Sequence, residues 1–284
     1  MSVAVAPVRV PGGGLVHELR ATAVVWEREM IRFGRDRARV VSTLAQPVLF
    51  LFVLGTGLSS LVHTGSGGVD FRTFLFPGVL AMSALFTAVF SGISMVWDRE
   101  FGFLREMLVA PVTTTSILLG KCLGGATMAT AQSVVILLLA GLVGVPYALG
   151  MMVELVGLLF ILSFLVTAMG LVLAARVRQI QAAMPMVQLI ITPMMFLSGA
   201  LFPLAALPAW LSVLVRLNPL TYAVEPMRAV VFDELGVPPA ARAALDPGIT
   251  WAGWHVPVAL QAALVVVLGL GLLGVAVLRF SRTE

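Results

Sequence analysis

The chain has 284 residues, of which 60% are hydrophobic and 11% are charged, and its formal net charge at pH 7 is +4. Soluble domains average about 45–50% apolar and about 25% charged residues, so this composition excludes an ordinary soluble domain and predicts an all-α integral membrane protein. Every basic residue except Lys121 is arginine, without the basic and aromatic alternation of a nucleic-acid surface, and the single cysteine, Cys122, excludes an intrachain disulfide.

The amino-terminal region begins with residues 1–14, which we expect to be a flexible tail and not a signal peptide, because they lack a long apolar stretch. Residues 15–37 then show an amphipathic helical pattern. Its apolar side consists of Leu15, Leu19, Thr22, Trp26, Met30 and Phe33, and its charged side of Arg20, Glu27, Arg28 and Arg32. Such a helix is expected to lie in the plane of the membrane interface.

Six apolar segments follow, each close to the roughly 20 residues that cross a hydrocarbon core of about 30 Å. We expect membrane spans at about residues 40–62, 74–96, 118–145, 153–175, 184–201 and 256–278, within one permease domain of residues 15–284. Pro47 predicts a kink in the first span. The basic residues give the orientation: with the amino terminus inside, fourteen lie on the cytoplasmic side and four outside. The positive-inside rule therefore predicts a multi-pass plasma-membrane protein with both termini in the cytoplasm.

Residues 207–232 do not fit the series of spans. They form two apolar, helix-like stretches that are each too short to cross a membrane, and Pro208 and Pro219 interrupt them. We interpret them as a re-entrant helix pair in the outer leaflet, before the sixth span.

The stretch WDREFGFLREMLVAP, residues 97–111, is a dense cluster of both charge signs between the second and third spans. At 100° per residue, one side carries Trp97, Phe101, Leu104 and Leu108, and the opposite side carries Asp98, Arg99, Arg105 and Glu106. This pattern favours a helix over about residues 97–110 that lies on the membrane surface or against a partner. A solvated loop with a lipid-facing stripe is one alternative that the pattern leaves open. Another is that the first part, through about Glu100, continues the second span.

These features together resemble a type-2 ATP-binding-cassette (ABC) exporter permease of the daunorubicin-exporter-like and polysaccharide-exporter-like kind. The residues that carry the resemblance are WDREFGFLREMLVAP with Gly120-Lys121, and SGALFPLAALPAWL with LNPLTYAVEPMRAV, between Ser198 and Val230. Each motif alone is moderately specific, but their order and spacing together are strongly indicative. The resemblance covers nearly the whole chain after Gly14.

The resemblance implies that residues 97–110 form a cytoplasmic coupling helix that docks in a cleft of an ABC ATPase subunit. Its docking residues would be Asp98, Arg99, Glu100, Phe101, Arg105 and Glu106, where the family often has Glu in place of Asp98, and the helical wheel adds Phe103 as an anchor. Two ATPase subunits and a second permease chain, identical or different, are then the expected partners. ATP and Mg²⁺ would be bound by the ATPase.

The chain itself carries no nucleotide-binding motif, so we expect it not to be an enzyme. Gly120-Lys121 lacks the upstream glycine and the following Ser or Thr of a phosphate-binding loop. Gly269, Gly271 and Gly274 match a dinucleotide fingerprint, but inside an apolar span, where small residues serve helix packing. No metal site is expected, because His17, His63 and His255 have no second ligand at a useful spacing.

Polar and methionine residues within the spans suggest a substrate route. The candidates are Gln132, Glu154, Gln188, Thr192, Met194, Met195 and Phe196. Polar groups in hydrocarbon need a partner or water, and methionines adapt to varied apolar ligands. Interhelical hydrogen bonding and ordinary core filling remain the simpler interpretations of the same residues.

An ATP-driven exporter of a lipophilic drug, lipid or lipid-linked glycan is therefore the predicted function, with membrane lipid as its surroundings. An ion-coupled secondary transporter is the first alternative, although it needs an ionisable residue near the membrane midplane. A membrane lipid-modifying enzyme is the second, although the sequence shows no paired carboxylates with His at one interface.

Overall fold

The computed structural model describes residues 14–57, 70–103, 112–177, 179–203, 208–245, 247–251 and 253–283. These residues are almost entirely helical. In chain order the elements are α1 (Leu15–Arg35), α2 (Arg37–Leu49), η1 (Phe50–Leu54, a π-helix), α4 (Phe71–Glu100), α6 (Thr114–Leu137), η2 (Ala140–Val143), α7 (Leu149–Arg176), α8 (Ile180–Phe196), α9 (Ala209–Leu217), α10 (Thr221–Glu234), α11 (Pro239–Leu245), β1 (Thr250–Trp251), β2 (Trp254–His255) and α12 (Val258–Thr283). The two short strands pair in antiparallel fashion.

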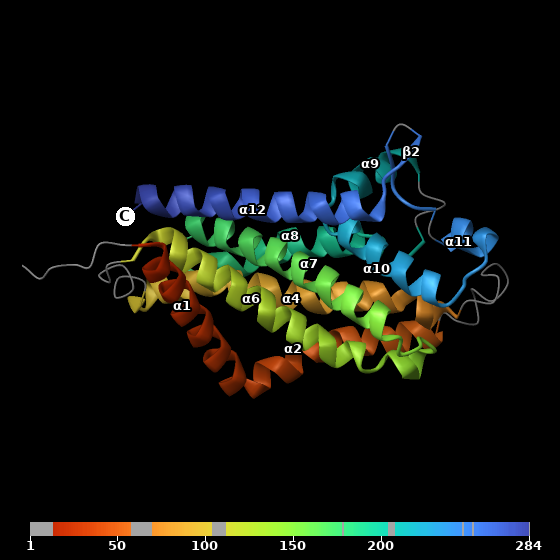
Figure 1. The fold of residues 1–284 in the computed structure, drawn as a ribbon, viewed down its shortest axis with the longest axis horizontal. Helices are drawn as coiled ribbons and strands as arrows, with labels where there is room; N and C mark the ends of the chain where they lie inside the picture. Colours follow the sequence, from red (N-terminus) through yellow and green to blue (C-terminus); the bar gives the residue numbers. More distant parts are fainter. Residues whose placement is uncertain are drawn as a thin grey trace, which may run out of the picture.

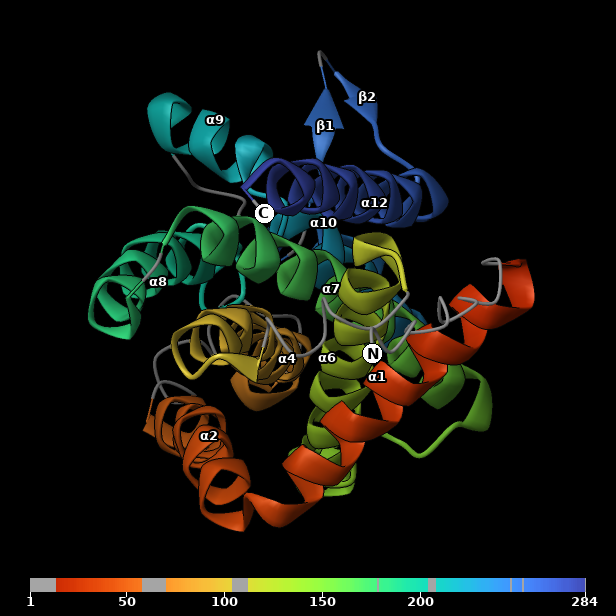
Figure 2. The same cartoon turned by 90° about the vertical axis from the view of Figure 1, so that its left-hand side faces the viewer.

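The long helices run side by side along the molecule, and α4 lies among them (Figure 1). Seen from the α1 end, α4 is surrounded by α2, α6, α7 and α8, while α12 covers the far side of α7 (Figure 2). Helix α1 crosses the bundle at one end and packs on α6. The β1–β2 hairpin, α9 and α11 lie at the opposite end (Figure 1).

Four of the described helical stretches are long and apolar enough to cross a membrane. They are Val40–Gly57, Phe71–Glu100, Leu149–Arg176 and Val258–Arg282, and α8 is an apolar helix of only 17 residues. The all-helical membrane architecture is thus confirmed, with four such stretches. Helix α6 covers most of the expected third span, but its sequence contains Lys121, Gln132 and many Gly, Ala and Thr residues, which lower its hydropathy.

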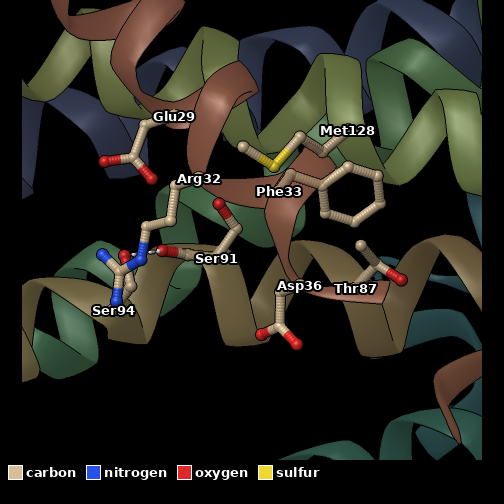
Figure 3. Close-up of a pocket in the computed structure, with 8 residues that line it drawn as sticks. All are labelled: Glu29, Arg32, Phe33, Asp36, Thr87, Ser91, Ser94 and Met128. Atoms are coloured by element: carbon tan, nitrogen blue, oxygen red, sulfur yellow. Dashed lines mark hydrogen bonds between the residues drawn. The ribbon is translucent and has the colours of Figure 1, made fainter. Parts of the chain in front are cut away.

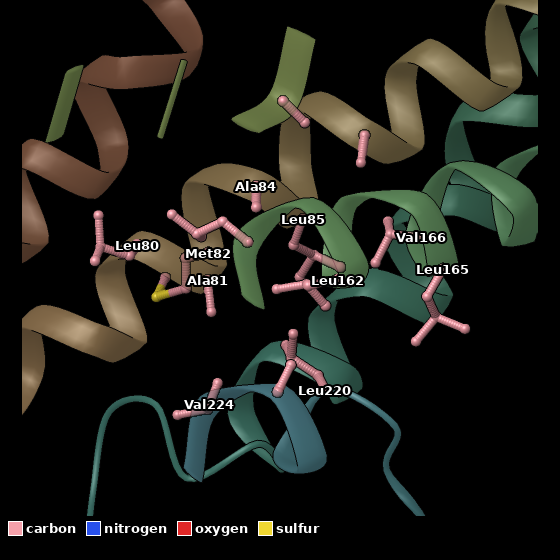
Figure 4. Packing of buried hydrophobic residues seen from close by; sticks show 14 of the residues in the cluster. Leu80, Ala81, Met82, Ala84, Leu85, Leu162, Leu165, Val166, Leu220 and Val224 are labelled. Atoms are coloured by element: carbon pink, nitrogen blue, oxygen red, sulfur yellow. The ribbon is translucent and has the colours of Figure 1, made fainter. Parts of the chain in front are cut away.

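The centre of the bundle is formed by α4, most of whose residues are buried within the chain. Leu80 and Leu85 on α4 pack with Leu162 and Val166 on α7, and α10 closes this cluster with residues that include Leu220 (Figure 4). Helix α4 begins at Asp70, whose carboxylate accepts a hydrogen bond from the Arg72 backbone N–H at 3.3 Å. A helix buried on all sides needs no polar face, which explains its nearly continuous apolar sequence.

Helices α4 and α7 approach each other so closely that only glycine fits at their crossing. A Cβ atom on Gly170 would lie 2.9 Å from the Val89 carbonyl oxygen and 3.0 Å from the Gly92 Cα atom. Small residues at such crossings let two helix backbones touch. The pair Gly92 and Gly170 therefore fixes how α7 lies on the central helix.

The expected boundaries differ from the observed ones because an apolar run can continue beyond the end of a helix. Helix α6 ends at Leu137 and not at 145, and α8 covers 180–196 instead of 184–201. The interfacial helix ends at Arg35, and α2 follows directly from Arg37. The π-helix η1 begins three residues after Pro47, whose missing N–H removes one helical hydrogen bond. The expected re-entrant pair corresponds to α9 and α10.

Candidate functional site: the carboxyl-terminal end of α4

The segment expected as a coupling helix does not begin at Trp97. Helix α4 continues through Glu100, and Phe101 caps it. Gly102 follows with φ +84°, a left-handed backbone conformation that ends helices and favours glycine. Residues 97–100 are therefore the last turn of α4, as in the alternative in which this part continues the second span. Residues 104–110, including Arg105 and Glu106, lie outside the described residues.

Asp98 is buried inside the chain, not exposed to a partner. Its side chain is 4% exposed. Its Oδ2 atom lies 2.6 Å from the Lys121 Nζ atom on α6 and 3.3 Å from an Arg28 Nη2 atom on α1. Its Oδ1 atom lies 3.3 Å from Arg32 Nη1, also on α1. The helices of the chain thus enclose Asp98, and a carboxylate at this depth needs these cations. Its role in docking an ATPase remains a prediction.

Lys121 is the centre of this arrangement. It is 2% exposed, and besides Asp98 it contacts Glu29 Oε1 at 3.2 Å and donates a hydrogen bond to Ser94 Oγ at 3.0 Å. Arg28 also pairs with Glu29 at 3.0 Å. We refer to Arg28, Glu29, Arg32, Asp98 and Lys121 as the ion-pair cluster. It joins α1, α4 and α6.

Glu29 is held ionised by the ion-pair cluster. Burial alone would raise the pKa of its carboxyl, but the ammonium of Lys121 and the guanidinium of Arg28 outweigh burial and hold that pKa below its ordinary value. The Glu29 carboxyl is therefore ionised at neutral pH. Lys121 was not predicted as a partner of Asp98, nor Glu29 as a second carboxylate beside Lys121. A lone lysine near the start of an apolar segment is the signal that could have pointed to them.

The next two expected docking residues also serve the fold. Arg99 donates hydrogen bonds to the Ala174 and Val177 carbonyl oxygens at 3.0 and 3.3 Å, and its guanidinium lies 5.0 Å from the Phe280 ring centroid. Glu100 accepts a hydrogen bond from the Ile180 backbone N–H at 3.0 Å. Both residues thereby tie the end of α4 to the junction between α7 and α8.

Phe101 and Phe103 are exposed, as is Glu100 before them. Their exposed fractions are 68% and 52%. Two exposed phenylalanines beside a chain reversal are unusual on a surface that faces only water. Their role as anchors for a partner remains a prediction.

A small polar cavity lies next to the ion-pair cluster. Its volume is about 30 Å³, and it is lined by Glu29, Arg32, Phe33, Asp36, Thr87, Ser91, Ser94 and Met128 from α1, α4, α6 and the turn after α1 (Figure 3). Thr87 is buried, and its Oγ1 atom has no hydrogen-bond partner among the described residues. The side chains of Glu29, Thr87 and Ser94 in the wall offer hydrogen-bond partners, and a space of this size can hold a water molecule.

The expected substrate-route residues do not gather at one site. Gln132 is buried and donates a hydrogen bond to Thr43 Oγ1, which links α6 to α2. Glu154 is exposed near the start of α7. Gln188 donates a hydrogen bond to Thr192 Oγ1 at 2.8 Å on α8. Met194, Met195 and Phe196 follow on the same helix, with Met195 buried and Phe196 exposed.

The amino-terminal half of α1 is held to the start of α6 by Glu18. Its Oε2 atom accepts hydrogen bonds from Ser116 Oγ at 2.5 Å, from Thr113 Oγ1 at 2.7 Å and from the Thr113 backbone N–H at 3.2 Å. These donors favour the ionised form and lower the pKa of the Glu18 carboxyl.

We expect Glu18→Gln to lower the thermal unfolding temperature of the detergent-solubilised protein at pH 7. A carboxyl whose pKa is depressed by folding stabilises the folded state above its unfolded pKa, and this contribution is lost as the pH falls through the folded pKa. The difference between the wild type and Glu18→Gln should therefore shrink below the ordinary Glu pKa of 4.5. A difference that stays constant over that pH range would contradict the assignment.

Comparison with known proteins identifies the family. The family described as ABC-2 type transporter matches residues 20–232. The chain belongs to the ABC-2 type transporter family. Among its relatives, the putative transport permease ycf38 of Cyanophora paradoxa is 30% identical over 209 residues, which cover 72% of each chain. Nodulation protein J of Rhizobium leguminosarum bv. viciae is 29% identical over 258 residues, which cover 90% of this chain and 95% of the relative.

A third relative extends the match over nearly the whole permease. The probable doxorubicin resistance ABC transporter permease protein DrrC of Mycobacterium tuberculosis (strain CDC 1551 / Oshkosh) is 26% identical over 272 residues, which cover 94% of this chain and 95% of the relative. The resemblance inferred from the motifs is confirmed. This ABC-2 permease is the membrane subunit of an ABC transporter, and its family implies an ABC ATPase subunit as its partner.

Proposed function

We propose that this permease moves a lipophilic or amphipathic substrate out of the cell, driven by two ABC ATPase subunits that dock on residues 101–110. The observation that carries the proposal is the position of the exposed Phe101 and Phe103 directly after α4, the most enclosed long helix of the bundle. A partner bound there acts on the centre of the permease. ATP and Mg²⁺ would be held by that partner.

The proposal includes six membrane spans, in which α6 and α8 join the four long apolar stretches. Helix α6 packs against α4 and α7, and its polar end is neutralised by the ion-pair cluster. Helix α8 flanks α4 in the bundle (Figure 2). The α1 end of the molecule would face the cytoplasm with both termini, because it collects most of the arginines.

An amphipathic substrate is supported by the character of α8 and by the family. Leu189 and Phe196 are 75% and 48% exposed on this helix, beside Gln188 and Thr192, so α8 offers apolar and polar groups together. The name of one relative refers to doxorubicin resistance. A second permease chain, identical or different, would complete a route along this face.

Docking can be tested with Phe103→Ala. Anchor phenylalanines at protein interfaces typically contribute about 2 kcal/mol or more, so the affinity for the ATPase subunit should fall by roughly 30-fold. The measurement is the binding of the purified ATPase to the permease in nanodiscs. Val267→Ala is the control, because Val267 is 66% exposed on α12 and far along the chain from the docking segment. Equal binding by the two variants would remove Phe103 from the interface.

Transport in sealed vesicles tests the energy source. Accumulation of doxorubicin, used as a fluorescent probe, should require ATP and the ATPase subunit. Accumulation driven by a proton gradient without ATP would instead establish an ion-coupled transporter.

A further inference from the structure

We infer that the ion-pair cluster is the joint through which movement of the α4 end reaches α1, with Asp98 as the positioning residue. The inference rests on the proposed function, because it requires an ATPase that acts on the segment after α4. It assigns to α1 a moving part in the transport cycle, where an interfacial helix would otherwise serve only as an anchor in the membrane surface.

Helices α1 and α6 are packed and hydrogen-bonded together as one unit. A Cβ atom on Gly120 would lie 2.7 Å from the Thr22 carbonyl oxygen, and one on Gly124 would lie 2.9 Å from Glu29 Cβ, so the two helices touch at these glycines. Thr22 Oγ1 and Trp26 Nε1 donate further hydrogen bonds across this contact, to the Ser116 carbonyl oxygen and to Thr127 Oγ1.

Helix α1 contacts α4 through charged side chains. Helix α1 packs along α6 and has little close contact with the α4 backbone. Arg28 and Arg32, one helical turn apart on α1, each contact one oxygen of the Asp98 carboxylate at 3.3 Å. A displacement of the α4 end therefore pulls on α1 through Asp98.

The ion-pair cluster can rearrange without losing all the contacts of Asp98. Asp98 has three cationic partners on two helices, so it keeps at least one partner while another is lost. The side chains of Arg28 and Arg32 are 40% and 45% exposed, so water can solvate either guanidinium when its pair opens. The adjoining cavity places room for a water molecule beside Ser94 and Glu29 (Figure 3). Water at the exposed arginines and in the cavity lowers the free-energy cost of exchanging the partners of Asp98.

The double substitution Arg28→Gln with Arg32→Gln tests the joint. It removes both direct contacts of α1 with Asp98 but leaves the path through Lys121, which pairs with Glu29 on α1 and with Asp98 on α4. Neither arginine is buried, so the variant is expected to fold. The matched control is Arg20→Gln with Arg35→Gln, because both residues are exposed on the same helix and carry the same charge. Asp98→Glu is a second control that keeps the carboxylate.

Movement is measured between spin labels at Ala23 on α1 and Val267 on α12, both exposed, in a Cys122→Ala background. Labelled chains are diluted with unlabelled ones in complexes with the ATPase, in nanodiscs. The change in the Ala23–Val267 distance on trapping with ATP and vanadate should appear in the wild type and both controls. It should be smaller in the Arg28→Gln, Arg32→Gln variant, because only the path through Lys121 remains, while that variant still binds the ATPase and hydrolyses ATP.

An unchanged movement of α1 in the double variant would overturn the inference. So would a wild-type complex that hydrolyses ATP while the Ala23–Val267 distance stays constant. A wild-type chain that recruits no ATPase would instead contradict the proposed function, so the two failures are distinguishable.

Discussion

Lys121→Met is expected to lower the free energy of unfolding of the permease by about 3–5 kcal/mol, because removing one partner of a buried ion pair leaves an uncompensated charge. Lys121 is 2% exposed and lies 2.6 Å from Asp98 and 3.2 Å from Glu29. Methionine has a similar length but no charge, so both carboxylates would depend on the half-exposed Arg28 and Arg32 alone.

Unfolding by SDS titration in mixed micelles measures this effect. Arg216→Met is the control, because Arg216 is an exposed basic residue at the end of α9 and its substitution should cost little. A double-mutant cycle with Asp98→Asn should show strong coupling, with the double variant less destabilised than the sum of the single ones. Additive effects, or equal losses in Lys121→Met and Arg216→Met, would show that the cluster contributes no stability.

The apolar pattern of the sequence predicted where the long helices lie, because length and hydropathy alone determine which segments suit a membrane. Residues 74–96 and 153–175 fall within α4 and α7. The pattern could not place the ends of these helices, since an apolar run continues through a turn as readily as through a helix. Helix α6 shows this: it ends at Leu137, and η2 continues the apolar run as a 3₁₀ turn.

The sequence contains a signal for the end of α4, but a second pattern outweighed it. Gly102 is a typical residue just past a helix end, and the structure has it in the left-handed conformation after the Phe101 cap. The 100° stripe through Trp97 and Phe101 favoured one continuous helix instead. A periodic pattern of four positions does not reveal a break within it.

The burial of Asp98 and its ion pairs could not be predicted from local sequence. Charged residues at the end of an apolar segment usually form a solvated surface, and the partners of Asp98 on α1 lie up to 70 positions away in the sequence. Only the packing of α1 on α6 brings Arg28 and Lys121 to the same carboxylate. Long-range pairing of this kind depends on the fold, which explains why the docking candidates divided into buried and exposed residues.

Gly170→Leu is expected to disrupt the bundle, at a cost of about 3 kcal/mol or more, because there is no room for a side chain where α7 crosses α4. Even a Cβ atom there would lie 2.9 Å from the Val89 carbonyl oxygen and 3.0 Å from Gly92 Cα. These are backbone atoms of the central helix and cannot rotate away, so α7 would have to separate from α4. The yield of monodisperse protein after detergent extraction and its thermal unfolding temperature should both fall sharply.

Gly157→Leu on the same helix is the matched control, because a Cβ atom at Gly157 meets nothing within 4 Å. It makes the same chemical change, and it carries the same gain in helix propensity of about 1 kcal/mol over glycine. Gly157→Leu should therefore leave stability unchanged or slightly raised while Gly170→Leu lowers it. If the two variants unfolded at the same temperature, the close crossing of α4 and α7 at Gly92 and Gly170 would not exist in the membrane.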